Sequence, residues 1–304
     1  MEPLDVTLAD VVAASRRIGP HLSPTPVVRS PWLSEVTGAE VHLKLETLQA
    51  TGSFKVRGAL CASAGNHAQG VAWGATMLGI SAMVVVPEGT PGLKREAIRR
   101  LGAELIVAGA SYDEAEDRAR AVQRETLRTL IHAFLDPKVV AGQGTLALET
   151  FAPNPDWDSV IVPAGGGGLI AGVGAVVKAM RPESAVLGVQ SEASAPWVRS
   201  FATGHVESVT YEPTLAEGLA GRIDAANFAL VRRVTDEMVE VEEIAIARAM
   251  AGLARHQHLL VEGAGAVGVA ALMTGRIRLP RGSRGNVGAD RLGSFEPTFT
   301  TPDR

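Results

Sequence analysis

The chain has 304 residues, 46% of them hydrophobic, which is enough to bury one large domain or two smaller ones. Its 29 Lys and Arg residues nearly balance 33 Asp and Glu residues, and no dense basic run occurs, so we expect no nucleic-acid binding. The single cysteine, Cys61, excludes an internal disulfide.

The predicted elements alternate between helices and short strands. A capping box at Thr7 and Asp10 opens a helix through about Ile18, and a proline-containing loop at 21–31 precedes a strand at 41–45. Further strands are expected at 82–86, 105–107, 159–162 and 185–189, and helices at 67–78, 92–101, 112–124, 169–180 and 242–256. This alternation predicts an α/β fold with mainly parallel sheets flanked by helices. The Gly- and Arg-rich stretch 281–304 is expected to be loop or disorder.

The N-terminus and the apolar runs bear on location. The first ten residues are acidic and contain neither a basic start nor an apolar block, so we expect no signal peptide. Apolar runs such as 82–86 are too short to cross a bilayer, so we expect no membrane association. Together these features favour a cytoplasmic globular protein.

A lysine lies in a turn of small residues just beyond the first strand, in the sequence TGSFK at 51–55. Lysine is the Schiff-base residue of carbonyl and pyridoxal-phosphate chemistry, because burial among suitable neighbours can lower the pKa of its amine. Most lysines are surface charges, so Lys55 taken alone does not establish catalysis.

A glycine-rich loop, PAGGGGL at 163–169, follows an apolar strand and opens a helix. Four consecutive glycines let backbone N–H groups converge on an anion, and the helix N-terminus adds a favourable field. The loop has neither the P-loop lysine nor spaced G-x-G-x-x-G glycines, which favours a compact phosphate over a nucleotide. A closely packed strand–helix turn is the alternative reading.

A third block, SAGNH at 63–67, is a turn of small residues before a helix. Its N–H groups can hold a carboxylate, and the Asn66 amide can hydrogen-bond a ring oxygen. Taken alone, it could equally be an ordinary loop with a helix cap.

Together the three blocks resemble the serine/threonine dehydratase (threonine ammonia-lyase) family of fold-type II pyridoxal-phosphate enzymes, which also contains serine racemases. The resemblance extends from about Leu43 to Leu272 through LKLETLQATGSFKVRGAL, SAGNHAQGVAW, LGAELIVAG, DPKVVAGQGTLALE, VPAGGGGLIAGV, EPTLAEGLAG and VEGAGAVGVAAL, in that order. It implies a two-domain, tryptophan synthase beta-like fold. Residues 1–47 and 145–304 would form the large cofactor-binding domain and 48–144 the small domain, with the cofactor in the cleft between them.

The resemblance implies that Lys55 holds pyridoxal 5'-phosphate as a Schiff base and that its freed amine takes the substrate Cα proton. The implied cofactor-binding residues are Phe54, Lys55, Asn66, Gly165, Gly166, Gly167, Gly168, Leu169, Glu217 and Ser283. Ser283 would meet the pyridine nitrogen, where a neutral hydroxyl favours loss of a β-hydroxyl over transamination. The implied substrate-binding residues are Ser63, Ala64, Gly65, Asn66 and His67.

The implied activity is dehydration and deamination of L-threonine or L-serine, a small amino-acid substrate, to a 2-oxo acid and ammonium by a homo-oligomer, either dimer or tetramer. A dehydratase of another hydroxy amino acid (phenylserine, hydroxyaspartate or a hydroxyectoine-pathway compound), a serine racemase, an inactive cofactor-binding homologue and a non-enzymatic scaffold remain alternatives.

Several positions depart from the family pattern. RGAL at 57–60 runs directly into CASAGN, without the helix, loop and strand that the family places there, and LPRGSRGN lacks the usual apolar strand before Ser283. Ala64 stands where racemases carry an acid/base serine, which disfavours racemisation because a methyl group cannot transfer a proton. The carboxylates of metal-binding relatives would fall at Gln190 and Pro196, so we expect no metal site.

Overall fold

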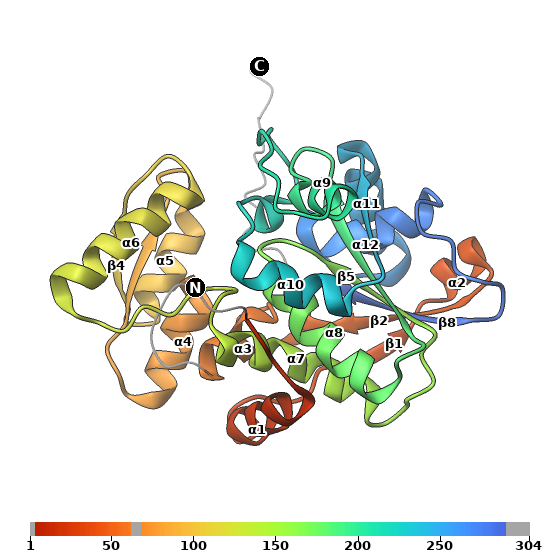
Figure 1. The fold of residues 1–304 in the computed structure, drawn as a ribbon, viewed down its shortest axis with the longest axis horizontal. Coiled ribbons are helices and arrows are strands. Elements are labelled where there is room, and N and C mark those ends of the chain that lie inside the picture. Colours follow the sequence, from red (N-terminus) through yellow and green to blue (C-terminus); the bar gives the residue numbers. More distant parts are fainter. Residues whose placement is uncertain (1–3, 62–67, 290–304) are drawn as a thin grey trace, which may run out of the picture.

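The computed structural model describes residues 4–61 and 68–289, and within them the main sheet has six strands in the order β1-β2-β8-β5-β6-β7 (Figure 1). All neighbouring strands are parallel except β1 and β2. The strands are β1 (Val27–Arg29), β2 (Glu40–Leu45), β5 (Ser159–Pro163), β6 (Ala185–Ser191), β7 (Glu237–Val241) and β8 (Arg284–Ala289). The predicted α/β fold with a mainly parallel, helix-flanked sheet is confirmed.

Helices cover both faces of this sheet because its central strands are apolar on both sides. In β5, Val160 and Val162 join one hydrophobic cluster and Ile161 joins the other, as the two-residue period of a strand requires. The first cluster includes side chains of α1 (Leu8–Ile18), α7 (Pro137–Phe151), α8 (Gly168–Met180), α9 (Pro196–Thr203) and α10 (Ala225–Val234). The second includes side chains of α2 (Pro31–Thr37), α11 (Glu243–Gln257) and α12 (Gly263–Met273).

A second, two-stranded parallel sheet pairs β3 (Met83–Val86) with β4 (Glu104–Val107). It lies on the left of Figure 1 with α4 (Ala68–Leu78), α5 (Gly92–Arg100) and α6 (Tyr112–Thr126), and a separate hydrophobic cluster includes Val84, Val86 and Ile98. Two sheets with separate cores support the expectation of two domains. The boundaries at 48 and 144 stay a prediction.

The start of α1 is set by a local signal. The predicted capping box is present, since the Asp10 N–H donates to Thr7 Oγ1 at 3.3 Å and the Thr7 N–H donates to Asp10 Oδ2 at 2.9 Å. In the part of the chain that the structure describes, no helix is both long and apolar enough to span a membrane.

Two segments differ from the sequence-based expectation. The predicted loop at 21–31 contains β1, and the stretch predicted as loop or disorder contains β8, which lies between β2 and β5. β8 reads RGNVGA, and its only large apolar side chain, Val287, is fully buried. Backbone pairing on both edges makes β8 a strand, and an apolar pattern of its own is not needed.

Candidate active site

Lys55 is the first residue of α3 (Lys55–Cys61). The chain reaches it from the carboxyl end of β2 through a short 3-10 helix, η1 (Glu46–Leu48), and a turn in which Gly52 has a φ of +72°. A positive φ is the conformation that glycine adopts without strain. The carboxyl ends of parallel strands are where open α/β sheets place their ligands, so the position of Lys55 is that of a site residue.

Two glycines bring α3 directly onto α7. A Cβ at Gly142 would lie 2.5 Å from the Arg57 carbonyl oxygen, and a Cβ at Gly58 would lie 2.5 Å from the Gln143 side-chain nitrogen. Only glycine permits helix backbones to approach so closely. The helix that begins with Lys55 is therefore seated firmly on α7.

A largely buried group of four charges also fixes this helix. Arg57 donates to both oxygens of Glu46, at 2.8 and 2.9 Å, and to both oxygens of Glu149, at 2.6 and 2.8 Å. Lys44 donates to Glu149 at 2.7 Å and to the Thr25 carbonyl at 2.7 Å. Burial alone would raise the pKa of Glu149, but hydrogen bonds from Arg57 and Lys44 hold that pKa below its ordinary value. This charge group joins β2, η1, α3 and α7.

The glycine loop connects β5 to α8, as expected from the sequence. Gly167 is the N-cap of α8 and has a φ of +93°. A Cβ there would lie 2.5 Å from Trp197, and a Cβ on Gly166 would overlap the ring of Phe134. Glycine is thus required on the packed side of the loop, and the backbone of this helix N-terminus forms a cradle that fits a phosphate group.

The lysine and the glycine loop come together around Gly218, in the 3-10 helix η2 (Glu217–Leu219). A Cβ on Gly218 would lie 3.8 Å from Lys55 Nζ, and a Cβ on Gly165 would lie 3.3 Å from the Gly218 carbonyl oxygen. The amine and the phosphate cradle therefore border the same turn, although more than 100 residues separate them in the sequence.

The remaining predicted cofactor residues differ in their burial. Phe54 and Leu169 are partly buried and pack against the first hydrophobic cluster. Glu217 is exposed and belongs to η2, directly beside Gly218. The predicted substrate turn, Ser63, Ala64, Gly65, Asn66 and His67, lies outside the described residues.

Ser283 is not part of this site, which corrects the role implied by the resemblance. It precedes β8, and its carbonyl accepts from the Glu40 N–H at the amino end of β2. Lys55 lies beyond the carboxyl end of β2, about 16 Å further along a strand of this length. The Ser283 hydroxyl instead donates to the Pro280 carbonyl at 2.7 Å. The missing apolar strand explains the misplacement, because RGN is itself used as the strand.

The structure adds one acidic group that the sequence motifs did not assign. Glu262 begins the segment EGAG and is the N-cap of α12, but its side chain makes no capping hydrogen bond. Its Oε1 lies 3.3 Å from the place of a Cβ on Gly218, on the same turn as the Lys55 amine. In the sequence, Glu262 could have been identified because it is an acidic residue directly before a glycine-rich segment.

A second ion cluster joins the loop after η2 to α6. Arg222 lies 3.5 Å from Asp117 and 3.6 Å from Glu116, and Glu116 also contacts His132 at 3.1 Å and Arg120 at 2.6 Å. Burial would raise the pKa of Glu116, yet His132 and Arg120 lower it to about 2. The cluster links α6 to the loop that follows the turn of Gly218.

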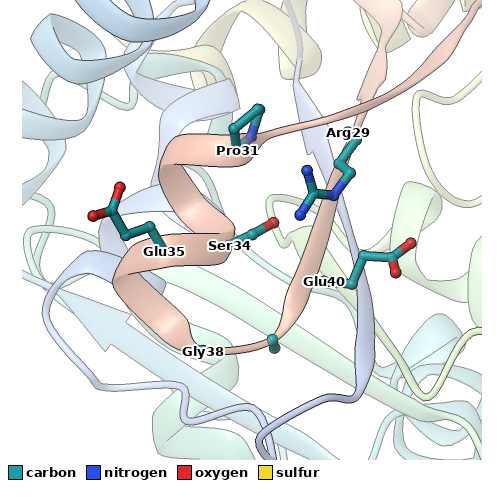
Figure 2. Close-up of a pocket in the computed structure, with 7 residues that line it drawn as sticks. Arg29, Pro31, Ser34, Glu35, Gly38 and Glu40 are labelled. Atoms are coloured by element: carbon teal, nitrogen blue, oxygen red, sulfur yellow. The ribbon is translucent and has the colours of Figure 1, made fainter.

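An open groove of about 380 Å³ lies between α2 and the start of β2, at the end of this strand that is opposite to Lys55 (Figure 2). Figure 2 shows Ser34 directed toward Arg29, with the carboxylates of Glu35 and Glu40 directed away. Ser34 is already hydrogen-bonded to Ser30 and Val41, and Glu40 is paired with Arg284. The groove contains none of the predicted site residues.

No group of three or more His, Cys, Asp or Glu side chains in the described residues could hold a metal ion. Gln190, at a position where metal-binding relatives would carry a carboxylate, is fully buried and bonded to backbone groups. The absence of a metal site stays a prediction.

Comparison with known proteins agrees with this geometry. A family model described as pyridoxal-phosphate dependent enzyme matches residues 18–287. The L-threonine ammonia-lyase of Thermotoga maritima is 44% identical over 285 residues, covering 88% of this chain and 71% of that protein. A T.th. threonine deaminase structure superposes with a TM-score of 0.88 at 36% identity, covering 96% of this chain and 100% of the other. A maize serine racemase structure gives 0.89 at 29% identity, covering 94% and 93%.

Proposed function

This chain belongs to the family of pyridoxal-phosphate dependent enzymes, and from that premise we propose that it converts L-threonine or L-serine to a 2-oxo acid and ammonium. Its cofactor is pyridoxal phosphate. In the reaction the Cα–H and Cβ–OH bonds break and water leaves. The released unsaturated amine then takes up water and loses ammonia.

One observation carries the proposal: the Lys55 amine and the glycine cradle border the same turn at Gly218. An amine nucleophile and a phosphate site beside the same turn are what a small aromatic aldehyde with a phosphate arm requires. Gly165, Gly166, Gly167 and Gly168 would hold the phosphate, and Lys55 would bind the aldehyde carbon.

The cofactor supplies an electron sink for the negative charge that develops at the substrate Cα. The chain would supply the proton transfer, with Nζ of Lys55 as the group that takes the Cα proton. The buried charges around Arg57 keep the backbone of Lys55 in place, and the glycine loop would hold the phosphate of the cofactor.

Elimination is favoured over racemisation by the residue at position 64. Racemisation needs a proton donor on the face opposite the lysine, and Ala64 has no group that can transfer one. The maize serine racemase has the same fold, so the fold alone does not separate the two activities. We infer that the side chain at position 64 does.

The test is a product assay on the cofactor-loaded protein with L-threonine and L-serine, measuring 2-oxo acid and ammonium together. We expect equal amounts of both products, and a loss of at least about 10²–10⁴-fold in Lys55→Ala. Lys94→Ala, on α5, is the control and should keep full activity. A protein that binds the cofactor and releases neither product would be an inactive homologue.

Borohydride reduction of the loaded protein gives an independent check of the lysine. After reduction and peptide mapping, the pyridoxyl group is expected on Lys55. Lys44 is fully buried and already bonded to Glu149 and Thr25. Modification of Lys44 or Lys94 would contradict the assignment.

The homo-oligomeric state and the cytoplasmic location remain predictions from the sequence. Exposed apolar side chains such as Ile244 and Leu215 support self-association, and the backbone of Leu215 is joined to the helix of Ile244, since the Leu215 N–H donates to the Glu243 carboxylate at 2.7 Å. Light scattering of the purified protein would distinguish monomer, dimer and tetramer.

A further inference from the structure

Three buried side chains hold three consecutive backbone carbonyls of the glycine loop. Gln190 Nε2 donates to the Ala164 oxygen at 2.9 Å, Trp197 Nε1 to the Gly165 oxygen at 2.6 Å, and Asn227 Nδ2 to the Gly166 oxygen at 2.7 Å. All three residues have an exposed fraction of 0%. We call Gln190, Trp197 and Asn227 the carbonyl clamp.

Two members of the clamp are themselves held in place. Gln190 Oε1 accepts from the Trp197 N–H at 2.8 Å, which fixes the orientation of the amide and leaves Nε2 for the loop. The Trp197 indole stacks on Phe228, with ring centroids 6.0 Å apart and an interplanar angle of 10°. The donors from β6, α9 and α10 therefore meet the loop as rigid groups.

The clamp determines where the loop's N–H groups point. In a trans peptide the C=O and N–H bonds point to opposite sides. With the carbonyls of 164–166 directed to the clamp, the N–H groups of Gly165, Gly166 and Gly167 are directed away from it. Within residues 4–61 and 68–289, none of these three N–H groups is hydrogen-bonded to a backbone carbonyl. Three neighbouring donors are thus directed to the side of the loop opposite the clamp.

Glycine runs adopt many backbone conformations, so four glycines alone do not define a cradle. An anion that had to order the loop would bind more weakly than one that meets a loop already ordered. We propose that Gln190, Trp197 and Asn227 are positioning residues that set the glycine loop for the cofactor phosphate. The inference rests on the proposed function, because it takes the cofactor phosphate to lie at this loop.

Trp197→Phe tests the clamp, because it removes one donor and keeps most of the aromatic packing. Trp157→Phe is the matched control, since Trp157 is also buried and its Nε1 donates to the Thr150 carbonyl, away from the loop. The cofactor-free protein is titrated with pyridoxal phosphate and, separately, with pyridoxal, which has no phosphate. We expect Trp197→Phe to raise the Kd for pyridoxal phosphate about tenfold or more and leave that for pyridoxal unchanged, while Trp157→Phe changes neither.

Asn227→Asp is the second variant. It keeps the size of the side chain and places a carboxylate oxygen against the Gly166 oxygen, so the Kd for pyridoxal phosphate should rise at least as much as in Trp197→Phe.

Two outcomes would overturn the clamp. One is an equal loss of affinity for pyridoxal phosphate and for pyridoxal, and the other is an equal effect of Trp197→Phe and Trp157→Phe on cofactor binding. These titrations need no substrate, so a chain that binds the cofactor through the clamp but does not deaminate threonine would contradict only the proposed function.

Discussion

The guanidinium of Arg57 meets the carboxylate of Glu46 edge to edge, with Nε 2.8 Å from Oε2 and Nη2 2.9 Å from Oε1. Both side chains are buried, and Arg57 is two residues from the lysine. Burial alone would lower the pKa of Arg57, but Glu46 and Glu149 raise it above its ordinary value, so the guanidinium stays charged. The pair fixes the start of α3 to η1 and thereby the position of Lys55.

Arg57→Met should destabilise the protein strongly, because it leaves the buried carboxylate of Glu46 without its arginine partner and removes two hydrogen bonds from the partly buried Glu149. Removing one member of a buried ion pair costs about 3–5 kcal/mol. Urea unfolding of the cofactor-free protein measures this loss. Arg118→Met is the control, since the ion pair of Arg118 with Glu125 is exposed and a change there should stay within about 0.5 kcal/mol. Equal midpoints for the two variants would show that the buried charges do not hold α3.

Gly167→Ala should abolish tight cofactor binding. The residue would need the left-handed conformation, and its Cβ would lie 2.5 Å from Trp197. Gly204→Ala is the matched control, because Gly204 has a φ of +83° and no atom within 4 Å of a Cβ position. In both variants an alanine in the left-handed conformation costs about 1–2 kcal/mol of backbone strain, but only Gly167→Ala distorts the glycine loop. Cofactor titration of both proteins separates the two effects, and similar affinities would count against the cradle.

Acid should weaken the fold through Glu116. Its pKa is lowered from 4.5 to about 2, so the contribution of this carboxylate to stability is present above about pH 4.5 and is lost as the pH falls toward 2. The difference in unfolding free energy between the natural chain and Glu116→Gln should therefore shrink over that range. Urea unfolding at a series of pH values measures it, with the exposed Glu125→Gln as control. A difference that does not vary with pH would refute the assigned role of the Arg120, His132 and Arg222 contacts.

Ala64→Ser should increase racemisation relative to elimination, since it introduces a hydroxyl where racemases carry a proton donor. In the natural chain, D-serine should form much more slowly than pyruvate, with slow leakage through water. Chiral chromatography of the remaining serine, together with 2-oxo acid release, measures both rates. Faster formation of D-serine than of pyruvate by the natural chain would refute both the proposed elimination and the role given to position 64.

The sequence determined those features whose signals are local. The capping box at Thr7 and Asp10, the apolar strands and the glycine loop each depend on neighbouring residues, and their elements formed where expected. Lys55 could be singled out because TGSFK occurs with a phosphate-type loop later in the chain. No similar signal exists for β8, which is a strand because β2 and β5 offer backbone partners on both sides.

The tertiary structure decided which distant groups share the site. Ser283 has the right residue type in a matching motif, yet the register of β8 against β2 puts it at the wrong end of the sheet. Lys55 and Glu262 come to lie beside Gly218 only through the packing of η2 and α12. Gln190, Trp197 and Asn227 come from three separate elements, so no spacing in the sequence indicates that they bond three adjacent carbonyls. Hydrogen bonds between distant segments depend on how sheets and helices pack, and a residue pattern read along one segment does not contain that information.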